Sequence, residues 1–150
     1  MTQYKNPIPV AVALIMNPTQ DKLLVGRRGI EPFIGKNALI GGYVDEGENF
    51  ETAISREVQE ETGQQLDQGK WIYQQSSITP RNQVLIFFKA TAPDLQFEQV
   101  ADTSEMSNMR WVTHEELLAD PLCFPLHQQA ALKAFDDALA LRIKEPSTSL

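Results

Sequence analysis

Residues 41–63 read GGYVDEGENFETAISREVQEETG, a glycine-rich loop that leads into an acidic segment. The pattern predicts a helix over Phe50–Thr62, because Asn49 can cap the first turn with its side-chain oxygen. Gly63 stands where a left-handed C-terminal cap is expected. The stretch therefore predicts where the helix begins and ends, and the acidity of its last turns needs its own explanation.

Three carboxylates gather on one side of this helix. At 100° per residue, taking Glu57 as 0°, Glu60 falls near 300° and Glu61 near 40°, within about 100° of arc. Ile54 and Val58 fall near 60° and 100°, so the acids border the apolar face. Like charges at this spacing repel by roughly 0.2–0.5 kcal/mol per exposed pair, and partial burial adds to that cost. A hard divalent cation that prefers oxygen ligands would reverse the repulsion. The alternative is a solvated acidic surface, which is common on helices.

The spacing of the whole stretch resembles the Nudix box, G-x5-E-x7-R-E-U-x-E-E-x-G-U, where U is an aliphatic residue. Its seven fixed positions are filled by Gly42, Glu48, Arg56, Glu57, Glu60, Glu61 and Gly63. Val58 fills the first U position, whereas Gln64 departs from the second, where we expect a local change in packing. The chain is thus identified as a member of the Nudix hydrolase family. The resemblance implies an α+β fold, an α/β/α sandwich with a mixed β-sheet between helices.

A second departure lies just before the box. The family often has W-x-L-P-G-G there, whereas this chain reads NALIGG over residues 37–42. Asn37 replaces the aromatic residue and Ile40 replaces the proline, but the glycine pair is kept. We therefore expect metal binding to be kept, while the packing of the entering strand and its contribution to substrate binding stay open.

The resemblance implies a site for a divalent cation, Mg²⁺ with Mn²⁺ as the alternative. Its oxygen ligands would be the carboxylates of Glu57, Glu60 and Glu61 and the backbone carbonyl of Gly41. Glu57 and Glu61 would be the main ligands, and Glu60 would bind directly or through water. Glu48 would pair with Arg56 and keep the carboxylates aimed without entering the reaction.

The reaction that the resemblance implies is attack of water on a phosphorus atom of a diphosphate bridge, which needs a general base. Family members often carry this base in a late loop, shortly before a tryptophan. Glu105 precedes Trp111 by six residues and is our candidate for the base or an added metal ligand. A solvated loop acid is the alternative, and Glu98 and Asp102 are weaker candidates for the same role.

Three residues outside the box are candidates for substrate binding. Arg81 lies in the expected turn Thr79–Asn82, where related enzymes contact their substrate. Arg28 ends an expected strand and could face the substrate, although solvent exposure is the default. Phe33 could stack on a base, but aromatic residues near a sheet are more often core. His127 is expected to be a surface or capping residue.

Residues 76–90 and 105–112 are loosely similar to Nudix enzymes that cleave ADP-ribose, NADH or FAD. The zinc ribbon of the NADH-cleaving branch is absent from this sequence, since Cys123 is its single cysteine. The S-Q-P-W-P-F-P-x-S signature of that branch is missing too. The leading hypothesis is an Mg²⁺-dependent pyrophosphohydrolase that cleaves a nucleoside diphosphate linked to another moiety, with ADP-ribose or a dinucleotide favoured.

Two other functions stay open. The first is a nucleoside triphosphate pyrophosphohydrolase, which uses the same chemistry but releases a monophosphate and pyrophosphate. The second is a non-catalytic Nudix-fold module that senses a nucleotide. Such modules commonly have eroded boxes, so the intact acids here argue against it.

The composition limits the class of protein. A net charge of -7 and a pI near 4.8 disfavour a nucleic-acid polymer as partner, although a cation can still bridge to a small phosphorylated substrate. No apolar run approaches the roughly 18 residues of a membrane span. The opening MTQYKNP lacks the pattern of a secretory signal, so we expect a cytoplasmic protein. A homodimer is an expectation by analogy with the family.

Hydrophobic periodicity outside the box predicts the remaining elements. Strands are expected at Val10–Met16, Lys22–Arg28, Ala38–Val44, Trp71–Ser76, Gln83–Thr91 and Met109–Thr113. Helices are expected at His114–Ala119 and Leu126–Ile143. Together they predict a single domain over 1–150 with a frayed tail at 144–150.

Overall fold

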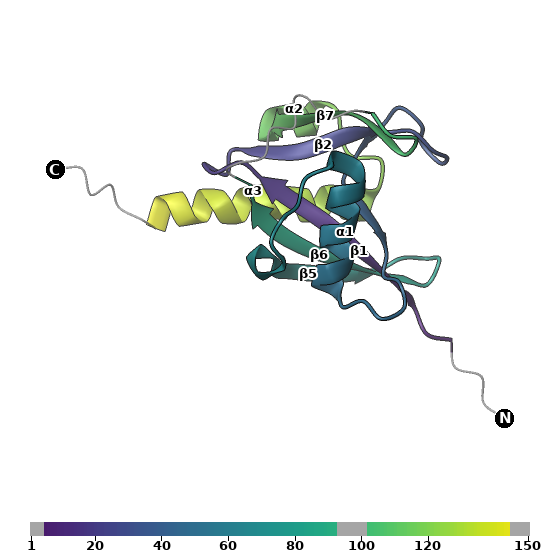
Figure 1. The fold of residues 1–150 in the computed structure, drawn as a ribbon. Coiled ribbons are helices and arrows are strands. Elements are labelled where there is room, and N and C mark those ends of the chain that lie inside the picture. Colours follow the sequence, from purple (N-terminus) through teal and green to yellow (C-terminus); the bar gives the residue numbers. More distant parts are fainter. Residues whose placement is uncertain (1–4, 93–101, 145–150) are drawn as a thin grey trace.

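The computed structural model describes residues 5–92 and 102–144 (Figure 1). Its strands are β1 (Ile8–Met16), β2 (Lys22–Arg28), β3 (Asn37–Ala38), β4 (Gly41–Tyr43), β5 (Ile72–Ile78), β6 (Gln83–Thr91) and β7 (Met106–Thr113). Its helices are α1 (Phe50–Thr62), the short 3-10 helix η1 (Gln68–Lys70), α2 (His114–Ala119) and α3 (Pro125–Lys144). Most of these elements were predicted by the sequence, and η1 was not.

The strands form one mixed sheet in the order β3-β2-β1-β6-β5, with β4 also paired to β1 and β7 to β2. Among these pairs β1 and β6 are parallel, and the others are antiparallel. The register that joins β1 to β2 is Met16 with Leu23, so the two strands are hydrogen-bonded at one end. Toward the other end, β3 pairs with β2 and β4 pairs with β1. The chain between β3 and β4 therefore crosses from β2 to β1.

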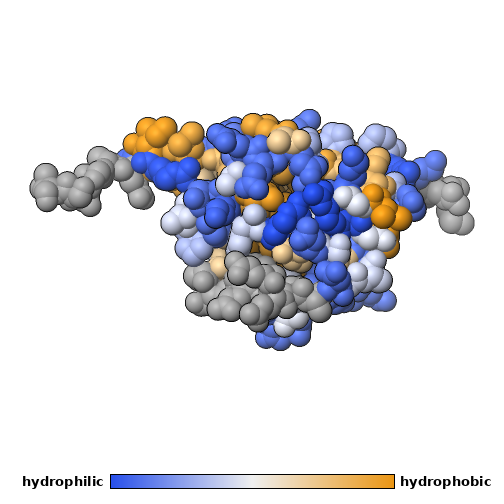
Figure 2. All heavy atoms as spheres, turned by 90° about the horizontal axis from the view of Figure 1, so that it is seen from above, coloured by the Kyte–Doolittle hydropathy of each residue, from blue (hydrophilic) through white to orange (hydrophobic). Residues whose placement is uncertain are grey.

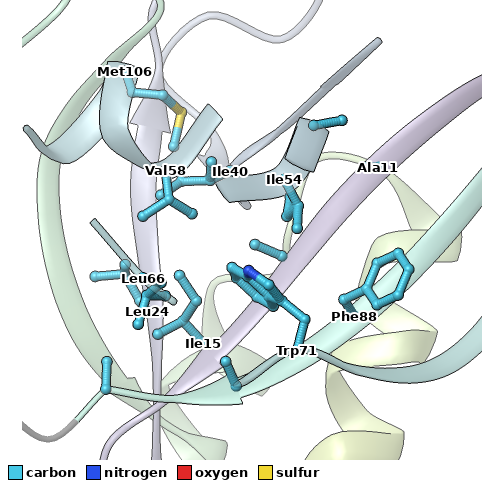
Figure 3. Close-up of a cluster of buried hydrophobic side chains, with 14 of the residues drawn as sticks. Ala11, Ile15, Leu24, Ile40, Ile54, Val58, Leu66, Trp71, Phe88 and Met106 are labelled. Atoms are coloured by element: carbon cyan, nitrogen blue, oxygen red, sulfur yellow. The ribbon is translucent and has the colours of Figure 1, made fainter. Parts of the chain in front are cut away.

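Helices cover both faces of the sheet, with α1 on one face and α3 on the other (Figure 1). On the α1 face, Ile54 and Val58 pack with Ile15 and Trp71 in one buried cluster (Figure 3). The cluster on the other face contains Leu14, Phe87 and Leu117 of α2, together with Ala130, Ala134 and Phe135 of α3. Because both faces of β1 are covered, every residue from Ala11 to Met16 is buried. The expected α/β/α sandwich is confirmed.

The predicted strand Ala38–Val44 is wrong as a single element. Leu39 and Ile40 separate β3 from β4, because the chain changes its partner strand there. The Ala13 amide donates to the Ile40 carbonyl at 2.8 Å, so the crossing segment is tied to β1. Ile40 is buried, so the position where the family often has proline is here part of the core.

Several boundaries also differ from the prediction: β1 begins two residues earlier than expected, and β5 runs over Ile72–Ile78 instead of Trp71–Ser76. β7 begins at Met106, three residues earlier than expected, because its first residues pair with the end of β2. α3 runs to Lys144, so this residue is helical and the predicted tail does not begin there. The rest of that tail, residues 145–150, lies outside the described residues.

The surface mixes polar and apolar residues. The face in Figure 2 is mainly hydrophilic, and its visible apolar residues form separate patches. Within residues 5–92 and 102–144, no helix is long and apolar enough to cross a membrane. The last turns of α3 expose Leu139, Leu141 and Ile143. The expected homodimer and cytoplasmic location stay predictions.

Candidate active site

Several segments meet at one end of the sheet. Because β1 is antiparallel to β2 and parallel to β6, β1 begins, β2 ends and β6 begins at this end. β7 begins there as well, since Met106 pairs with Arg28. β4 lies against the first half of β1, with Gly42 opposite Ala11. This end therefore gathers the box glycines, Arg28, the loop that carries Glu105 and the turn that carries Arg81.

The helix α1 has the predicted caps. The Thr52 amide donates to the Asn49 side chain at 2.8 Å, and Gly63 adopts a left-handed φ of 70°. The helical phase places Glu57 and Glu61 toward the sheet, where they are only 8% and 7% exposed, whereas Glu60 is exposed. The prediction that the acids border the apolar face is thus correct for Glu57 and Glu61, whereas Glu60 points to solvent.

Glu57 lies directly against the box glycines. A Cβ atom on Gly42 would overlap the Glu57 carboxylate, so only glycine leaves room for it at this position. Gly41 directly precedes Gly42 and pairs with Val12 of β1. The glycine pair therefore lets the main chain approach the buried carboxylate closely, as a shared metal site would need.

Arg56 is the hub that holds the box together. Its Nε donates to Glu48 Oε2 at 2.8 Å and its Nη2 to Glu48 Oε1 at 3.0 Å, a two-point pairing. Its Nη1 donates to Glu57 at 3.0 Å and to Glu60 at 3.2 Å, and its Nη2 also reaches the Tyr43 carbonyl at 3.0 Å. The predicted pairing of Glu48 with Arg56 is confirmed, whereas its role in aiming the ligands stays a prediction.

The two buried carboxylates are electrostatically costly. Burial raises the pKa of Glu57 to about 7, against the opposing effect of Arg56, and the charges of Glu60 and Glu105 add to the rise. Burial also raises the pKa of Glu61, against a hydrogen bond from Thr103 and with help from Glu105 and Glu60. The charge of Glu105 thus acts on both buried acids.

This donor set fits a hard divalent cation. Two buried carboxylates lie one helical turn apart, the first of them, Glu57, lies against Gly42, and both offer oxygen, the ligand atom that Mg²⁺ prefers. Among the described residues, no group of three or more His, Cys, Asp or Glu side chains is placed so that it could hold a metal ion. Arg56 draws Glu57 and Glu60 toward itself. The site therefore suits a cation that completes its shell with water and substrate phosphates, as Mg²⁺ usually does.

The loop before β7 is attached to α1 and to the end of β2. Thr103 Oγ1 donates to Glu61 Oε2 at 2.6 Å, and the Gly29 amide donates to the Glu105 carbonyl at 2.8 Å. Asp102 is tied to β7, where its side chain accepts from the Asn108 amide at 3.1 Å. Glu98 lies outside the described residues. Sequence reasoning identified Glu105 but missed Thr103, because no local pattern links it to a residue 42 positions away.

Arg28 and Phe33 meet at a second group of residues, the aromatic platform, formed by Arg28, Phe33, Phe124 and His127. The Arg28 guanidinium lies 5.1 Å from the centre of the Phe124 ring. Phe33 meets the same ring edge-on at 5.7 Å, with His127 4.9 Å away. Phe33 has a φ of 69°, uncommon for a bulky residue, and its side chain stays 48% exposed. Sequence reasoning missed Phe124.

His127 is not the surface or capping residue that we expected. Its ring packs edge-on against Phe87 at 5.6 Å and lies against Phe124. Burial lowers the pKa of His127 to about 4, and the nearby charge of Arg28 contributes in the same direction. The expectation was wrong because His127, in the first turn of α3, is turned toward the sheet, where its ring meets Phe87 of β6.

The remaining candidates lie outside both groups. Arg81 is exposed in the turn between β5 and β6, and its role in substrate binding stays a prediction. Asn37 is 1% exposed, accepts from Arg110 Nη2 at 2.6 Å and donates to the Asp120 carbonyl at 2.8 Å. It is therefore a buried hydrogen-bonded link between strands and α2. Gln64 stands where the family motif has an aliphatic residue. Two residues further along, Leu66 is buried in the core cluster of the α1 face.

The chain belongs to the NUDIX family, because residues 7–133 match the family model described as NUDIX domain. This confirms the resemblance drawn from the box. Among solved structures, a NUDIX hydrolase from Nitrosomonas europaea has a TM-score of 0.73 at 20% identity, covering 91% of this chain and 74% of that one. The NUDIX domain of Shewanella oneidensis NrtR complexed with ADP ribose has a TM-score of 0.67 at 23% identity, covering 91% and 90%. At this identity both support the fold alone.

The curated relatives have names that state a substrate. The human NAD-capped RNA hydrolase NUDT12 is 29% identical over 117 residues, which cover 78% of this chain and 24% of that protein. The human mitochondrial NAD(P)H pyrophosphatase NUDT13 is 29% identical over 114 residues, covering 76% and 32%. The NAD-capped RNA hydrolase NudC of Mycobacterium tuberculosis is 27% identical over 112 residues, covering 75% and 35%. The match thus spans about a quarter to a third of the length of these relatives.

Proposed function

We propose that this chain is a Mg²⁺-dependent pyrophosphohydrolase that cleaves the diphosphate bridge of a dinucleotide-type substrate by attack of water on phosphorus. The observation that carries the proposal is the pair of buried carboxylates, Glu57 and Glu61, with the charge of Glu105 acting on both. The names of the curated relatives, NAD(P)H pyrophosphatase and NAD-capped RNA hydrolase, support the same chemistry.

Glu57 and Glu61 would hold the cation, with Glu60 and the Gly41 carbonyl as further ligands. When bound there, Mg²⁺ neutralises phosphate oxygens and lowers the pKa of a coordinated water. Arg56 keeps Glu48, Glu57 and Glu60 in place through its hydrogen bonds. Mn²⁺ could replace Mg²⁺, since both prefer oxygen ligands.

Glu105 would take the proton from the attacking water. Its loop comes from a different part of the chain than α1, yet its charge acts on both buried acids. A base must reach the water within hydrogen-bond distance once substrate is in place. The exposed side chain of Glu105 leaves it free to make that approach from the solvent side.

The aromatic platform would bind one half of the substrate. Rings of nucleotides stack on aromatic faces, and a guanidinium adds attraction for π-systems and phosphates. Phe33 offers an exposed ring, and Arg28 lies beside Phe124 at the same end of the sheet as the box glycines. Arg81 would approach the substrate from the turn before β6.

NADH is the leading substrate, because the relatives' names refer to NAD(P)H and to NAD caps. ADP-ribose shares the adenosine diphosphate half and is the next case. The acidic net charge of -7 disfavours long RNA in general, but an NAD-capped RNA presents the same diphosphate and belongs in the test.

The test is phosphate release with Mg²⁺ from NADH, ADP-ribose, FAD, an NAD-capped RNA oligonucleotide and the nucleoside triphosphates. Each reaction is coupled separately to alkaline phosphatase and to inorganic pyrophosphatase, with Glu61→Gln as control. We expect phosphate through the phosphatase alone, on NADH or another dinucleotide, and loss of that signal in the variant.

Other outcomes replace the proposal with a named alternative. Phosphate from a nucleoside triphosphate through the pyrophosphatase would make the protein a nucleoside triphosphate pyrophosphohydrolase. Binding of a nucleotide without turnover of any substrate would favour the sensing module. Turnover of the capped RNA with none of free NADH would move the substrate to the polymer.

A further inference from the structure

Thr103 joins two parts of the site that are far apart in sequence. Its hydroxyl lies 2.6 Å from Glu61 Oε2 and 3.2 Å from the Met106 carbonyl. A hydroxyl has one proton, and the shorter distance to a carboxylate is the stronger hydrogen bond. Thr103 therefore donates to Glu61, and its oxygen accepts from the Met106 amide at 3.0 Å.

Thr103 is itself held firmly. Its amide donates to the Met106 carbonyl at 2.8 Å, so its backbone and its side chain both bond to the first residue of β7. The hydroxyl thus reaches Glu61 from the start of a paired strand. Its position is set by the sheet, which makes it suited to fix the orientation of another group.

The bond engages one of the two oxygens of Glu61, Oε2, at 2.6 Å. Glu57, by comparison, already accepts from Arg56. Each buried acid therefore has one fixed donor, and in Glu61 that donor comes from the loop of the candidate base.

A second contact fixes the same loop at its other end. Gly29, the residue directly after Arg28, donates its amide to the Glu105 carbonyl at 2.8 Å. A Cβ on Gly29 would lie 2.5 Å from the Ser104 carbonyl oxygen, so the loop packs onto bare backbone here. The loop is thus bound to α1 through Thr103 and to the end of β2 through Glu105.

We propose that Thr103 is a positioning residue that orients the Glu61 carboxylate for the metal and fixes the loop of Glu105 relative to it. The proposal deepens the proposed function and rests on it for the effect on turnover, but not for the effect on metal binding. Outer partners of metal ligands typically contribute 10- to 100-fold to metal affinity or activity. Thr103 takes no part in the reaction itself.

The experiment compares Thr103→Val, which keeps the shape and removes the donor, with Thr103→Ser, which keeps the donor. The first readout is the dissociation constant for Mn²⁺, measured by electron paramagnetic resonance on the full chain without substrate. We expect Mn²⁺ to bind about tenfold more weakly in Thr103→Val and within about twofold of the wild type in Thr103→Ser. Thermal unfolding of both variants without metal checks that each is folded.

The second readout is steady-state kinetics on whichever substrate the wild type cleaves. We expect kcat to fall about tenfold in Thr103→Val with little change in KM, and Thr103→Ser to restore kcat. Equal Mn²⁺ affinity in the valine variant and the wild type, with both folded, would overturn the proposal. Equal losses in the valine and serine variants would overturn it as well, because the hydroxyl would then not be the cause.

The two readouts separate this inference from the proposed function. If the wild type cleaves nothing in the substrate panel, the proposed function fails while the Mn²⁺ comparison still decides the role of Thr103. If the wild type cleaves a dinucleotide and the two variants bind Mn²⁺ alike, the function stands and the positioning role fails.

Discussion

The helix α1 and the aromatic platform are built in opposite ways. In α1 the caps, the hub Arg56 and the buried acids all come from residues 41–63, so the geometry follows from one helix and its loop. The platform joins Arg28 and Phe33 to Phe124 and His127, which lie some ninety residues further along the chain. The box residues of the candidate site are local in sequence, although Thr103 and Glu105 reach the site from a distant loop, and the proposed recognition surface depends on the tertiary fold.

The difference implies a division of roles. Changes to the buried acids of α1 should affect turnover with little effect on folding, because these acids are costly to bury without a metal. Changes in the platform should affect substrate affinity, and changes to the His127 ring should also affect the free energy of unfolding. Each of the following experiments tests this division of roles between α1 and the platform.

Replacing Glu61 with glutamine should have the largest effect. Loss of a metal ligand is expected to lower kcat/KM by about 1,000-fold, equivalent to roughly 4 kcal/mol. The free energy of unfolding without metal should stay equal or rise, because an unfavourable buried charge is removed. Kinetics and urea unfolding measure the two effects.

Glu51→Gln, in the first turn of the same helix, is the matched control and should stay near wild-type activity. A large loss of stability in Glu61→Gln would contradict the division, since the acid would then be structural.

Replacing Glu105 with glutamine tests the candidate base. We expect kcat to fall roughly 100-fold with KM nearly unchanged, because the group that accepts the proton of the attacking water is lost. Steady-state kinetics measure this, with Glu115→Gln as the control at an exposed acid outside the site. A change of only a few-fold would end the role of Glu105 as base.

Lowering the pH should lower the free energy of unfolding, because His127 resists protonation in the folded protein. Its pKa is lowered from 6.5 to about 4 in the folded protein, so the unfolded chain binds the proton more readily. The stabilising effect of the neutral ring is therefore complete above pH 6.5 and is lost as pH falls toward 4. After allowance for partial exposure, the loss should be about 2 kcal/mol.

Urea unfolding between pH 4 and 7 measures this loss, and His127→Gln serves as the variant that cannot titrate. The slope of unfolding free energy against pH should be smaller in that variant. Identical slopes in the two proteins would contradict the burial of His127 that the platform requires.

Replacing Phe124 with leucine should have the smallest effect. Loss of the ring removes the contacts with Arg28 and Phe33, so KM should rise about tenfold while kcat changes within about twofold. Phe50→Leu, an exposed aromatic residue on α1, is the control. A fall in kcat with KM unchanged would show that the platform belongs to the chemical step instead.

The same contrast explains what could be predicted from the sequence. Local rules were sufficient for the caps of α1, the pairing of Glu48 with Arg56 and most strand positions. They failed where distant contacts decide. The helical phase put Glu60 with the other acids, but the sheet covers only Glu57 and Glu61. Strand Ala38–Val44 was divided by a change of partner that no local pattern encodes.

The proposed recognition surface was the least predictable part. Arg28 and Phe33 could be proposed as substrate contacts, but nothing near them in sequence pointed to Phe124. Thr103 was missed for the same reason, because its importance comes from a hydrogen bond to a helix 42 residues away. Asn37 was seen as a departure from the family pattern, yet its role as a buried link required the positions of Arg110 and Asp120.

The most direct test of the central claim is the position of Mn²⁺ in crystals of the wild-type protein, located by its anomalous scattering. The account predicts one peak within about 2.1–2.4 Å of carboxylate oxygens of both Glu57 and Glu61, with Arg56 displaced from Glu57 but still paired with Glu48. A bound Mn²⁺ at any other group, with Glu57 and Glu61 free of it, would contradict the account.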